Sequence, residues 1–357
     1  MRKTTTILKV LLIFTLIVCI LLYAKSVLAP LAIAAILAML FVGLSKKLEK
    51  RGWPRWASAL LSVGILFAST TGLLLLLSWQ MQSFASNIDS MKENILQLIA
   101  RLQNWIDAQF GLDQEQQKSL AKEQVATGKS NSGMASSFAS GFFSLLVDMI
   151  LVFVYTYLLL FYRTRIKKFL IRVSAPNDQE QALEIAHRST EVATSYMSGL
   201  AKMIVVLWLL YGSAFSLIGV ENALFFAVLC GVLELVPFIG NLTGTGLTIL
   251  GVIAQGGKSD LIIGVLVVYA VVQFVQTYLL EPLIVGTEVN INPLFTIISL
   301  VAAEAIWGIS GMVLAIPVAG IIKIVCDTVP SLQPYGYLIG SDKKRRQAPW
   351  QRKGAEK

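Results

Sequence analysis

Two hydrophobic stretches of this chain are interrupted where a membrane helix would be expected to continue. They cover residues 221–255 and 293–329, and their interruptions lie at 234–241 and 304–311. Each half holds only about 14–17 residues, whereas a helix needs roughly 20 apolar residues to cross a bilayer. Non-helical backbone at membrane depth is tolerated only inside protein or beside a water-filled cavity. The pattern therefore predicts two re-entrant hairpins, which is typical of the binding site of a transporter.

The composition places the rest of the chain in a membrane as well. The residues are 55% hydrophobic and 14% charged, with a mean hydropathy of +0.69, outside the range of soluble domains. Six further segments are long enough, or nearly so, to span: residues 7–24, 28–44, 57–80, 141–162, 203–219 and 261–280. A signal peptide is an alternative for the first, but the repeated insertion that follows favours a retained anchor. We expect an all-α polytopic membrane protein with about eight membrane segments.

Four clusters of basic residues determine the expected orientation. They lie at 2–9, 46–55, 163–172 and 343–346, whereas region 81–140 balances five basic against six acidic residues. Because basic residues gather on the cytoplasmic side of a membrane, both termini are predicted to be cytoplasmic. This holds only if the two broken stretches enter from opposite faces, or if both cross completely. The same rule accounts for the net charge of +9, so we expect no nucleic-acid partner.

The order of segments predicts five regions. They are N-terminal membrane spans (1–80), an extracytoplasmic amphipathic helical region (81–140), a fourth span with a cytoplasmic linker helix (141–202), a transport core with both broken hairpins (203–330), and a basic cytoplasmic tail (331–357). From Ile88 to Trp105, apolar residues recur at the steps of a coiled-coil seam. The seam could pack within one subunit or join subunits. The serine-rich segment after Gly128 is interpreted as a flexible return to the membrane.

Carboxylates inside apolar segments are the strongest candidates for function, because a charge in hydrocarbon is costly and usually faces a cavity, a partner or an ion path. Glu234 and Glu304 lie in the two breaks, Glu281 ends the span 261–280, and Asp148 lies in the fourth span. Each could instead be held by hydrogen bonds and only shape the chain. We assign Glu234 to proton or cation binding and Glu304 to the counterpart position in the second break.

Proline and glycine residues are expected to shape the hairpins, because they end helices and permit tight turns. These residues are Pro237, Gly240, Gly308, Gly311 and Pro317. After the first break a new half-helix is expected to begin near Asn241 and Thr243. Its first N–H groups are free to meet an anion or a polar ligand. We therefore predict that Asn241 and Thr243 face the substrate.

Segment 261–280 carries a polar face that includes Gln273 and Gln276. Buried amides are costly unless they are paired. These side chains therefore either bond neighbouring helices or line a substrate pathway, and we include both glutamines in the predicted site. Glu281 precedes Pro282, and a residue before proline avoids helical geometry. The helix is therefore predicted to end there.

Other chemistries have little support in the sequence. The three cysteines show no paired spacing, and His187, the single histidine, fits a solvated helix face. We expect no metal site and no cofactor. The phosphate-binding pattern G-x-x-x-x-G-K-[ST] does not occur, so we do not expect transport to be driven by ATP hydrolysis. No buried nucleophile and base are arranged as in an enzyme, and we expect no enzymatic activity.

Four blocks of residues resemble the signatures of the autoinducer-2 exporter family. The blocks are Glu234-Leu-Val-Pro237-Phe-Ile-Gly240, then Gln273 through Gly286, then Asn292-Pro293, and finally Gly308-Ile-Ser-Gly311 through Ala319. Their spacing fits, as do the N-terminal spans and the polar insertion. The resemblance covers essentially the whole chain. Family members often carry proline where Asn241 stands and histidine where Asn292 stands, so these departures leave the substrate open.

The resemblance implies a bacterial inner-membrane protein with about eight membrane segments that assembles as a homo-oligomer, a pentamer in particular. Some members are thought to export autoinducer-2, and others to exchange sodium or lithium for protons. The expected partners are the lipid bilayer and a small polar solute, H⁺ or Na⁺. The expected function is a secondary transporter that exports a small polar solute coupled to an ion gradient. A Na⁺(Li⁺)/H⁺ antiporter and a non-transporting membrane scaffold are the alternatives.

Overall fold

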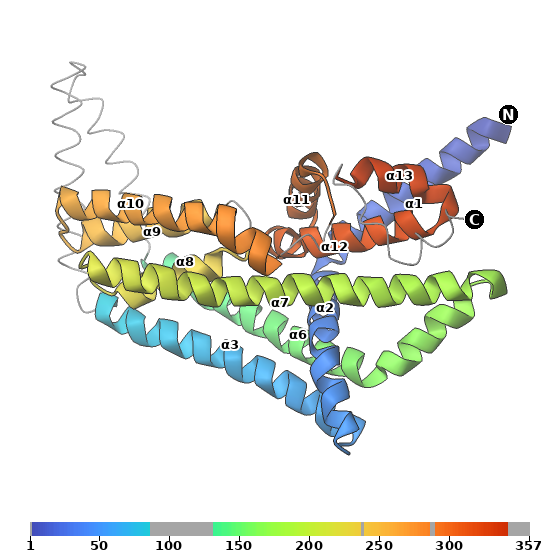
Figure 1. Cartoon of the computed structure of the whole chain (residues 1–357), viewed down its shortest axis with the longest axis horizontal. Helices are drawn as coiled ribbons and strands as arrows, with labels where there is room; N and C mark the ends of the chain where they lie inside the picture. Colours follow the sequence, from blue (N-terminus) through green and yellow to red (C-terminus); the bar gives the residue numbers. More distant parts are fainter. Residues whose placement is uncertain (1, 86–130, 237–238, 286–289, 342–357) are drawn as a thin grey trace, which may run out of the picture.

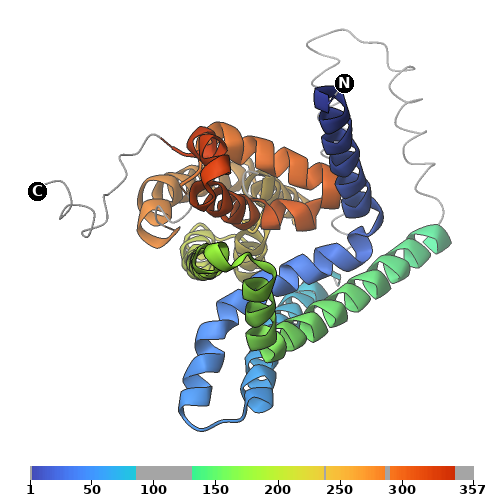
Figure 2. The ribbon, with the colours of Figure 1, turned by 90° about the vertical axis from the view of Figure 1, so that its right-hand side faces the viewer.

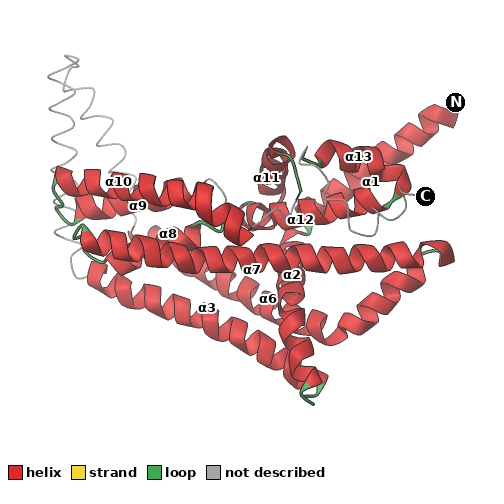
Figure 3. Ribbon diagram, in the orientation of Figure 1, coloured by secondary structure: helices red, strands yellow, loops and turns green. Residues whose placement is uncertain are grey.

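The fold, seen in a computed structural model, is a set of long helices and two helical hairpins (Figures 1 and 3). The structure describes residues 2–85, 131–236, 239–285 and 290–341. Within these ranges the secondary structure is helical, apart from an isolated bridge between Ile291 and Gly340. The α-helices are α1 (Arg2–Tyr23), α2 (Lys25–Lys50), α3 (Arg55–Ala85), α6 (Asn131–Val173), α7 (Gln179–Leu217), α8 (Ala223–Leu233), α9 (Ile239–Ala254), α10 (Ser259–Val275), α11 (Pro293–Trp307), α12 (Ile309–Thr328) and α13 (Gln333–Ile339). Short helical segments η1 (Pro176–Asp178), η2 (Gln276–Val285) and η3 (Pro330–Leu332) join them.

Among the described residues the fold is all-helical, as predicted, and six of its helices are long and apolar enough to cross a membrane. They are α2, α3, α6 from Leu146, α7, α10 extended to Glu281, and α12. Shorter apolar helices are Leu11–Tyr23, α8, α9 and α11. The prediction that every half of a broken stretch is too short to cross was wrong for α12. This helix has 20 residues because it begins at Ile309, inside the predicted break, and Pro317 lies within it without ending it.

The predicted extracytoplasmic region lies mostly outside the described residues, and so does the proposed coiled-coil seam. Its two borders are helical, since α3 continues to Ala85 and α6 begins at Asn131. The serine-rich segment 131–140 is therefore helix, and not the flexible return that its composition indicated. Serine is only mildly unfavourable in a helix, so neighbouring residues can draw it into one.

Helix α7 is the axis on which the other parts pack. Seen end-on in Figure 2, it lies between α2, α3 and α6 on one side and the hairpin helices on the other. Its buried apolar residues recur at helical spacing and form the main core with α8, α9 and α10. They are Tyr196, Leu200, Met203, Leu207, Tyr211 and Phe215. The predicted linker helix and the following span are thus one continuous helix of 39 residues.

The first broken stretch forms a hairpin of α8 and α9. A Cβ atom at Gly240 would collide with the backbone of Leu233, and a Cβ at Gly251 would collide with the ring of Phe226. Glycine at these positions allows the two helices to approach closely, as small residues do between membrane helices. The break predicted between residues 234 and 241 is confirmed, because α8 ends at Leu233 and α9 begins at Ile239.

The second broken stretch forms a hairpin of α11 and α12, with its turn at Gly308. That residue has φ of 62° and ψ of −138°, a backbone conformation that favours glycine. Next to the turn, Trp307 donates a hydrogen bond from Nε1 to the carbonyl of Leu21 at 3.0 Å, so this tip contacts α1. Helix α12 packs on α7, whereas α11 has no buried residue.

The base of this second hairpin is tied to the C-terminal helix. Asn292 caps α11 by accepting a hydrogen bond from the Phe295 amide at 2.9 Å. Its Nδ2 donates to the carbonyls of Leu338 at 2.8 Å and Gly340 at 3.3 Å, and its backbone N–H donates to Ile339 at 2.9 Å. We call this contact, between residues 291–292 and 338–340, the C-terminal clasp. It holds the start of α11 against the end of α13.

Helices α2, α3 and α6 are joined to one another by a polar cluster near the turn between α2 and α3. Arg163 of α6 forms an ion pair with Glu49 at 2.5 Å and donates to the Ser45 hydroxyl at 2.9 Å. The Ser58 hydroxyl donates to Glu49 at 3.1 Å. Because both charged side chains are largely buried, each depends on the other for neutralisation. The cluster fixes α2, α3 and α6 to one another.

Candidate functional site

The centre of the candidate site is Glu234, which follows the last residue of α8. The helix ends there in a turn, in which the amides of Leu235 and Val236 donate to the carbonyls of Val232 and Leu233. This turn places the Glu234 carboxyl against η2. Oε1 of Glu234 accepts a hydrogen bond from Nε2 of Gln276 at 2.5 Å. The two residues are 42 positions apart, and both were predicted as site residues.

Gln276 is the most enclosed member of the site, with 1% of its surface exposed. Its Nε2 is bonded to Glu234, but its Oε1 is buried and has no partner among the described residues. The Oε1 of Gln273, one turn earlier, is also buried without a described partner. Buried polar atoms are nearly always paired with protein or ordered water. The two amides therefore leave two hydrogen-bond acceptors available inside the protein.

The helix around these glutamines is wider than an α-helix. Residues Gln276–Val285 form a π-helical segment, η2, which runs through Glu281 and Pro282. The prediction that the helix ends at Glu281 was therefore wrong. A π turn bonds each amide to the carbonyl five residues back, and a local change of helical turn can accommodate proline in an apolar helix. Such segments occur frequently at functional sites. Glu281 itself is exposed, within electrostatic range of Glu234.

Helices α7 and α9 complete the surroundings of Glu234. The Tyr211 hydroxyl of α7 lies 3.5 Å from Oδ1 of Asn241 in α9, which is longer than a normal O–H···O hydrogen bond. Asn241 is buried, as the prediction of a site residue requires, whereas Thr243 is exposed. Tyr196 of α7 also lies within electrostatic range of Glu234. Glu234, Asn241 and Gln276 thus come from three elements that meet on one side of α7.

Two tyrosines of α7 were missed by sequence reasoning. Tyr196 lies in the predicted linker helix and Tyr211 in the predicted span 203–219, and neither was among the predicted site residues. Both are buried in the main core, and their hydroxyls bring polar groups into it. The signal that could have found them is a hydroxyl repeated on the buried face of one helix, since a buried tyrosine usually finds a hydrogen-bond partner.

Glu304 lies apart from this group of residues. It is exposed on α11, and no hydrogen bond or ion pair joins it to Glu234 in the described ranges. Its own tip is held to α1 by Trp307 instead. Of the hairpin-shaping residues, Gly240, Gly311 and Pro317 are buried and Gly308 forms the turn, whereas Pro237 lies outside the described residues.

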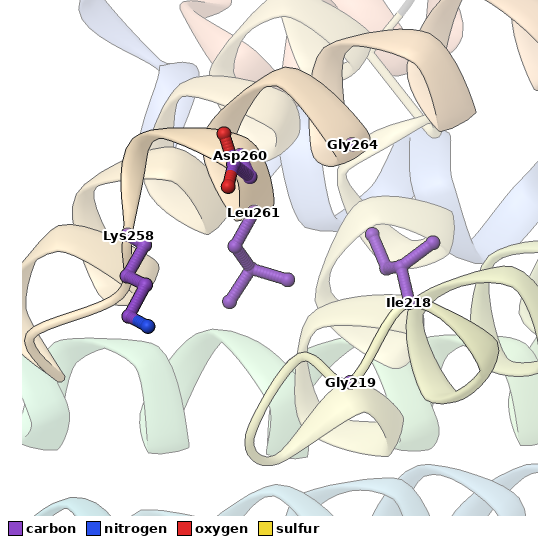
Figure 4. A pocket seen from close by; sticks show the side chains of 6 residues that line it. All are labelled: Ile218, Gly219, Lys258, Asp260, Leu261 and Gly264. Carbon is purple, nitrogen blue, oxygen red and sulfur yellow. The ribbon is translucent and has the colours of Figure 1, made fainter.

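A separate surface cavity of about 410 Å³ lies at the turns between α7 and α8 and between α9 and α10 (Figure 4). It is lined by Ile218, Gly219, Lys258, Asp260, Leu261 and Gly264. None of the predicted site residues lines it. In the part of the chain that the structure describes, no three His, Cys, Asp or Glu side chains are grouped to hold a metal ion.

Comparison of the sequence with known proteins identifies a family of membrane transporters. The family model for AI-2E family transporters matches residues 10–331. YrrI of Bacillus subtilis strain 168, named as a transport protein, is 22% identical over 84% of this chain and 86% of its own length. PerM of Escherichia coli strain K12, named as a permease, is 26% identical over 87% of this chain and 90% of its own length. YhhT of the same strain, named as a transport protein, is 23% identical over 91% of both chains.

Proposed function

The chain belongs to the AI-2E transporter family, and from this premise we propose that it is a secondary transporter that exports a small polar solute in exchange for an ion bound at Glu234. Membership makes it a multi-pass membrane transporter. The identity of the solute, the coupling ion and the direction of transport are part of our proposal. The single observation that carries it is the pairing of Glu234 with Gln276 between a broken hairpin and a π-helical segment.

A carboxylate in this place can bind and release a small cation or a proton. Glu234 is partly enclosed, and its only described side-chain partner is a neutral amide. No basic side chain among the described residues neutralises its charge, so a proton or a metal cation can do so. Carbonyl groups at the end of α8 favour positive charge at the same point. These features support ion coupling at Glu234 more than a purely structural role.

The solute would bind next to the ion. Asn241 is buried beside Tyr211, and Gln273 and Gln276 supply carbonyl oxygens that have no partner among the described residues. Thr243 and Glu281 are exposed and would contact the solute only along its path. Glu304, on the other hairpin, would act separately from Glu234. In this proposal the protein is a homo-oligomer in the bacterial inner membrane with both termini in the cytoplasm, as the basic clusters and the family resemblance favour.

The test is Glu234→Gln in proteoliposomes that contain the full chain. Glutamine keeps the shape and most hydrogen bonds of glutamate but cannot take up a proton. We expect pH-dependent flux of Na⁺ and of autoinducer-2 to be abolished, while membrane insertion and thermal stability stay near those of the wild type. Glu221→Gln is the matched control, because Glu221 is exposed in the turn before α8.

The flux of the two probes separates the candidate functions. Autoinducer-2 efflux that requires a proton gradient supports the exporter. Sodium–proton exchange alone supports the antiporter, and a scaffold would show no flux of either. Normal pH-dependent flux in a correctly inserted Glu234→Gln protein would contradict the proposal, and coupling would then have to be sought at Glu281 or Asp148.

A further inference from the structure

The side-chain amide of Gln276 is bonded on one side and free on the other. Its Nε2 donates to Glu234, and its buried Oε1 has no described partner. A carboxamide carries its donor and its acceptor on opposite sides of one rotatable bond. The terminal torsion of glutamine has a broad, nearly two-fold profile. Half a turn about this bond therefore exchanges the two groups without any movement of the backbone.

The proton on Glu234 decides which orientation is stable. An ionised carboxylate only accepts hydrogen bonds, so it requires Nε2 of Gln276 to face it. A protonated carboxyl also has an O–H donor, which can be given to Oε1 after the amide has rotated. In the first state the free group of Gln276 is an acceptor, and in the second state it is a donor.

We propose that Gln276 is a positioning residue that converts protonation of Glu234 into a change in what the site can bind. The inference rests on the transport function proposed above. When Glu234 is ionised, negative charge and a free acceptor oxygen suit a ligand that is positively charged or donates hydrogen bonds. When Glu234 takes a proton from the aqueous phase, the charge is removed and the free N–H group repels the same ligand. Proton and ligand therefore compete, which favours exchange over co-transport.

The neighbouring Gln273 provides a matched comparison. It lies one turn earlier, and its Oε1 is also buried without a described partner. Its Nε2, however, donates to the Thr277 hydroxyl at 3.3 Å. A hydroxyl can both donate and accept, so this bond can form whatever the protonation state of Glu234. Gln273 shares the helix and the chemistry of Gln276 but not its contact with a carboxyl group.

Other ionisable groups near Glu234 are unsuited to the same role. Glu281 of η2, Tyr196 and Tyr211 of α7, and Cys230 of α8 lie within electrostatic range of Glu234. Tyr269 of α10 lies near Tyr211. Glu281 acts on Glu234 through its charge, whereas Tyr196, Tyr211 and Cys230 are uncharged at neutral pH. None of these groups is hydrogen-bonded to the Glu234 carboxyl among the described residues. Gln276 alone has such a bond among the described side chains.

The experiment is a pH titration of the reconstituted full chain by difference infrared spectroscopy, with glutamine side chains labelled with ¹³C. The band of protonated Glu234 is assigned by its loss in Glu234→Gln, and the band of Gln276 by its loss in Gln276→Met. In the wild type we expect both bands to change with one midpoint. Na⁺, used as the probe cation, should move that midpoint to lower pH because it competes with the proton.

Two variants test whether Gln276 responds to the protonation of Glu234 or only fills space beside it. A charge-assisted hydrogen bond is about twice as strong as a neutral one. Loss of the amide in Gln276→Met should therefore move the Glu234 midpoint by about one pH unit upward, a tenfold change in proton affinity. The Na⁺ effect should also weaken. Gln273→Met should leave the Glu234 midpoint measured without Na⁺ as in the wild type, because Nε2 of Gln273 is bonded to Thr277 and not to Glu234.

Two results would overturn the inference. One is an unchanged midpoint in a folded Gln276→Met protein. The other, which needs no Gln276 variant, is a wild-type titration in which no glutamine band changes at the Glu234 midpoint. If flux stays pH-dependent in Glu234→Gln, the proposed function itself fails. If that variant is inactive and Gln276→Met titrates normally, only the role of Gln276 is refuted.

Discussion

Substitution of Asn292 would measure how much this residue stabilises the base of the second hairpin. Its side chain caps α11 and donates to two carbonyls of the C-terminal clasp. Loss of an N-cap costs about 1 kcal/mol, and each donated bond contributes about 0.5–1.5 kcal/mol. Because Asn292 is only partly buried, we take the lower end of that range. Asn292→Ala should then lower the free energy of opening of the clasp by about 2 kcal/mol.

The second variant in this series is Asn292→Ser. Serine is a good N-cap but cannot reach both carbonyls, so its cost should be about 1 kcal/mol. Native-state hydrogen exchange reports local opening directly. In peptides covering 290–300 and 333–341, exchange should become roughly 30-fold faster in Asn292→Ala and about 5-fold faster in Asn292→Ser. Peptides from α9 serve as the internal control and should be unaffected. Equal exchange in wild type and Asn292→Ala would refute the clasp.

Two further predictions concern the first hairpin. Gly240→Ala should destabilise the protein by about 1–3 kcal/mol, because its Cβ would meet the backbone of Leu233. A Cβ at Gly246, in the same helix, would meet open space. Gly246→Ala should therefore leave the midpoint of thermal unfolding within about a degree of the wild-type value. Equal effects of the two substitutions would contradict the close approach of α8 and α9. For topology, cysteines placed at Gly219 and Gly256 should both react with an impermeant maleimide from outside, since the hairpin would then begin and end on one side. Labelling of Gly256 from the cytoplasm alone would mean that 221–255 crosses completely.

The two breaks could be read from the sequence because their causes are local. Proline and glycine can interrupt a helix in an apolar stretch, and Gly308 forms its turn where the pattern placed it, although Pro317 lies inside α12 without ending it. The identity of Glu234, Asn241 and Gln276 as candidates also followed from polarity within apolar segments. Residue type and position along the chain were sufficient for both conclusions.

The pairings within the site could not be read in this way. The bond between Glu234 and Gln276 joins residues 42 positions apart, and it depends on how two elements pack against α7. Glu304 had the same local setting as Glu234, yet its hairpin packs elsewhere. The helix through Pro282 is a further case, since a wider turn removes the local reason for a break. Contacts that depend on packing are absent from local patterns.

The unbroken length of α7 has a consequence for every part that touches it. Ala193 packs with α2 and α12 through Ile36 and Leu314, and Tyr211 lies beside Asn241 of the first hairpin. These two positions are 18 residues apart, which is about five whole turns, so both point in the same direction. One residue inserted between them would rotate one relative to the other by about 100°. The rotation of α7 about its own axis therefore determines the orientation of both hairpins relative to each other.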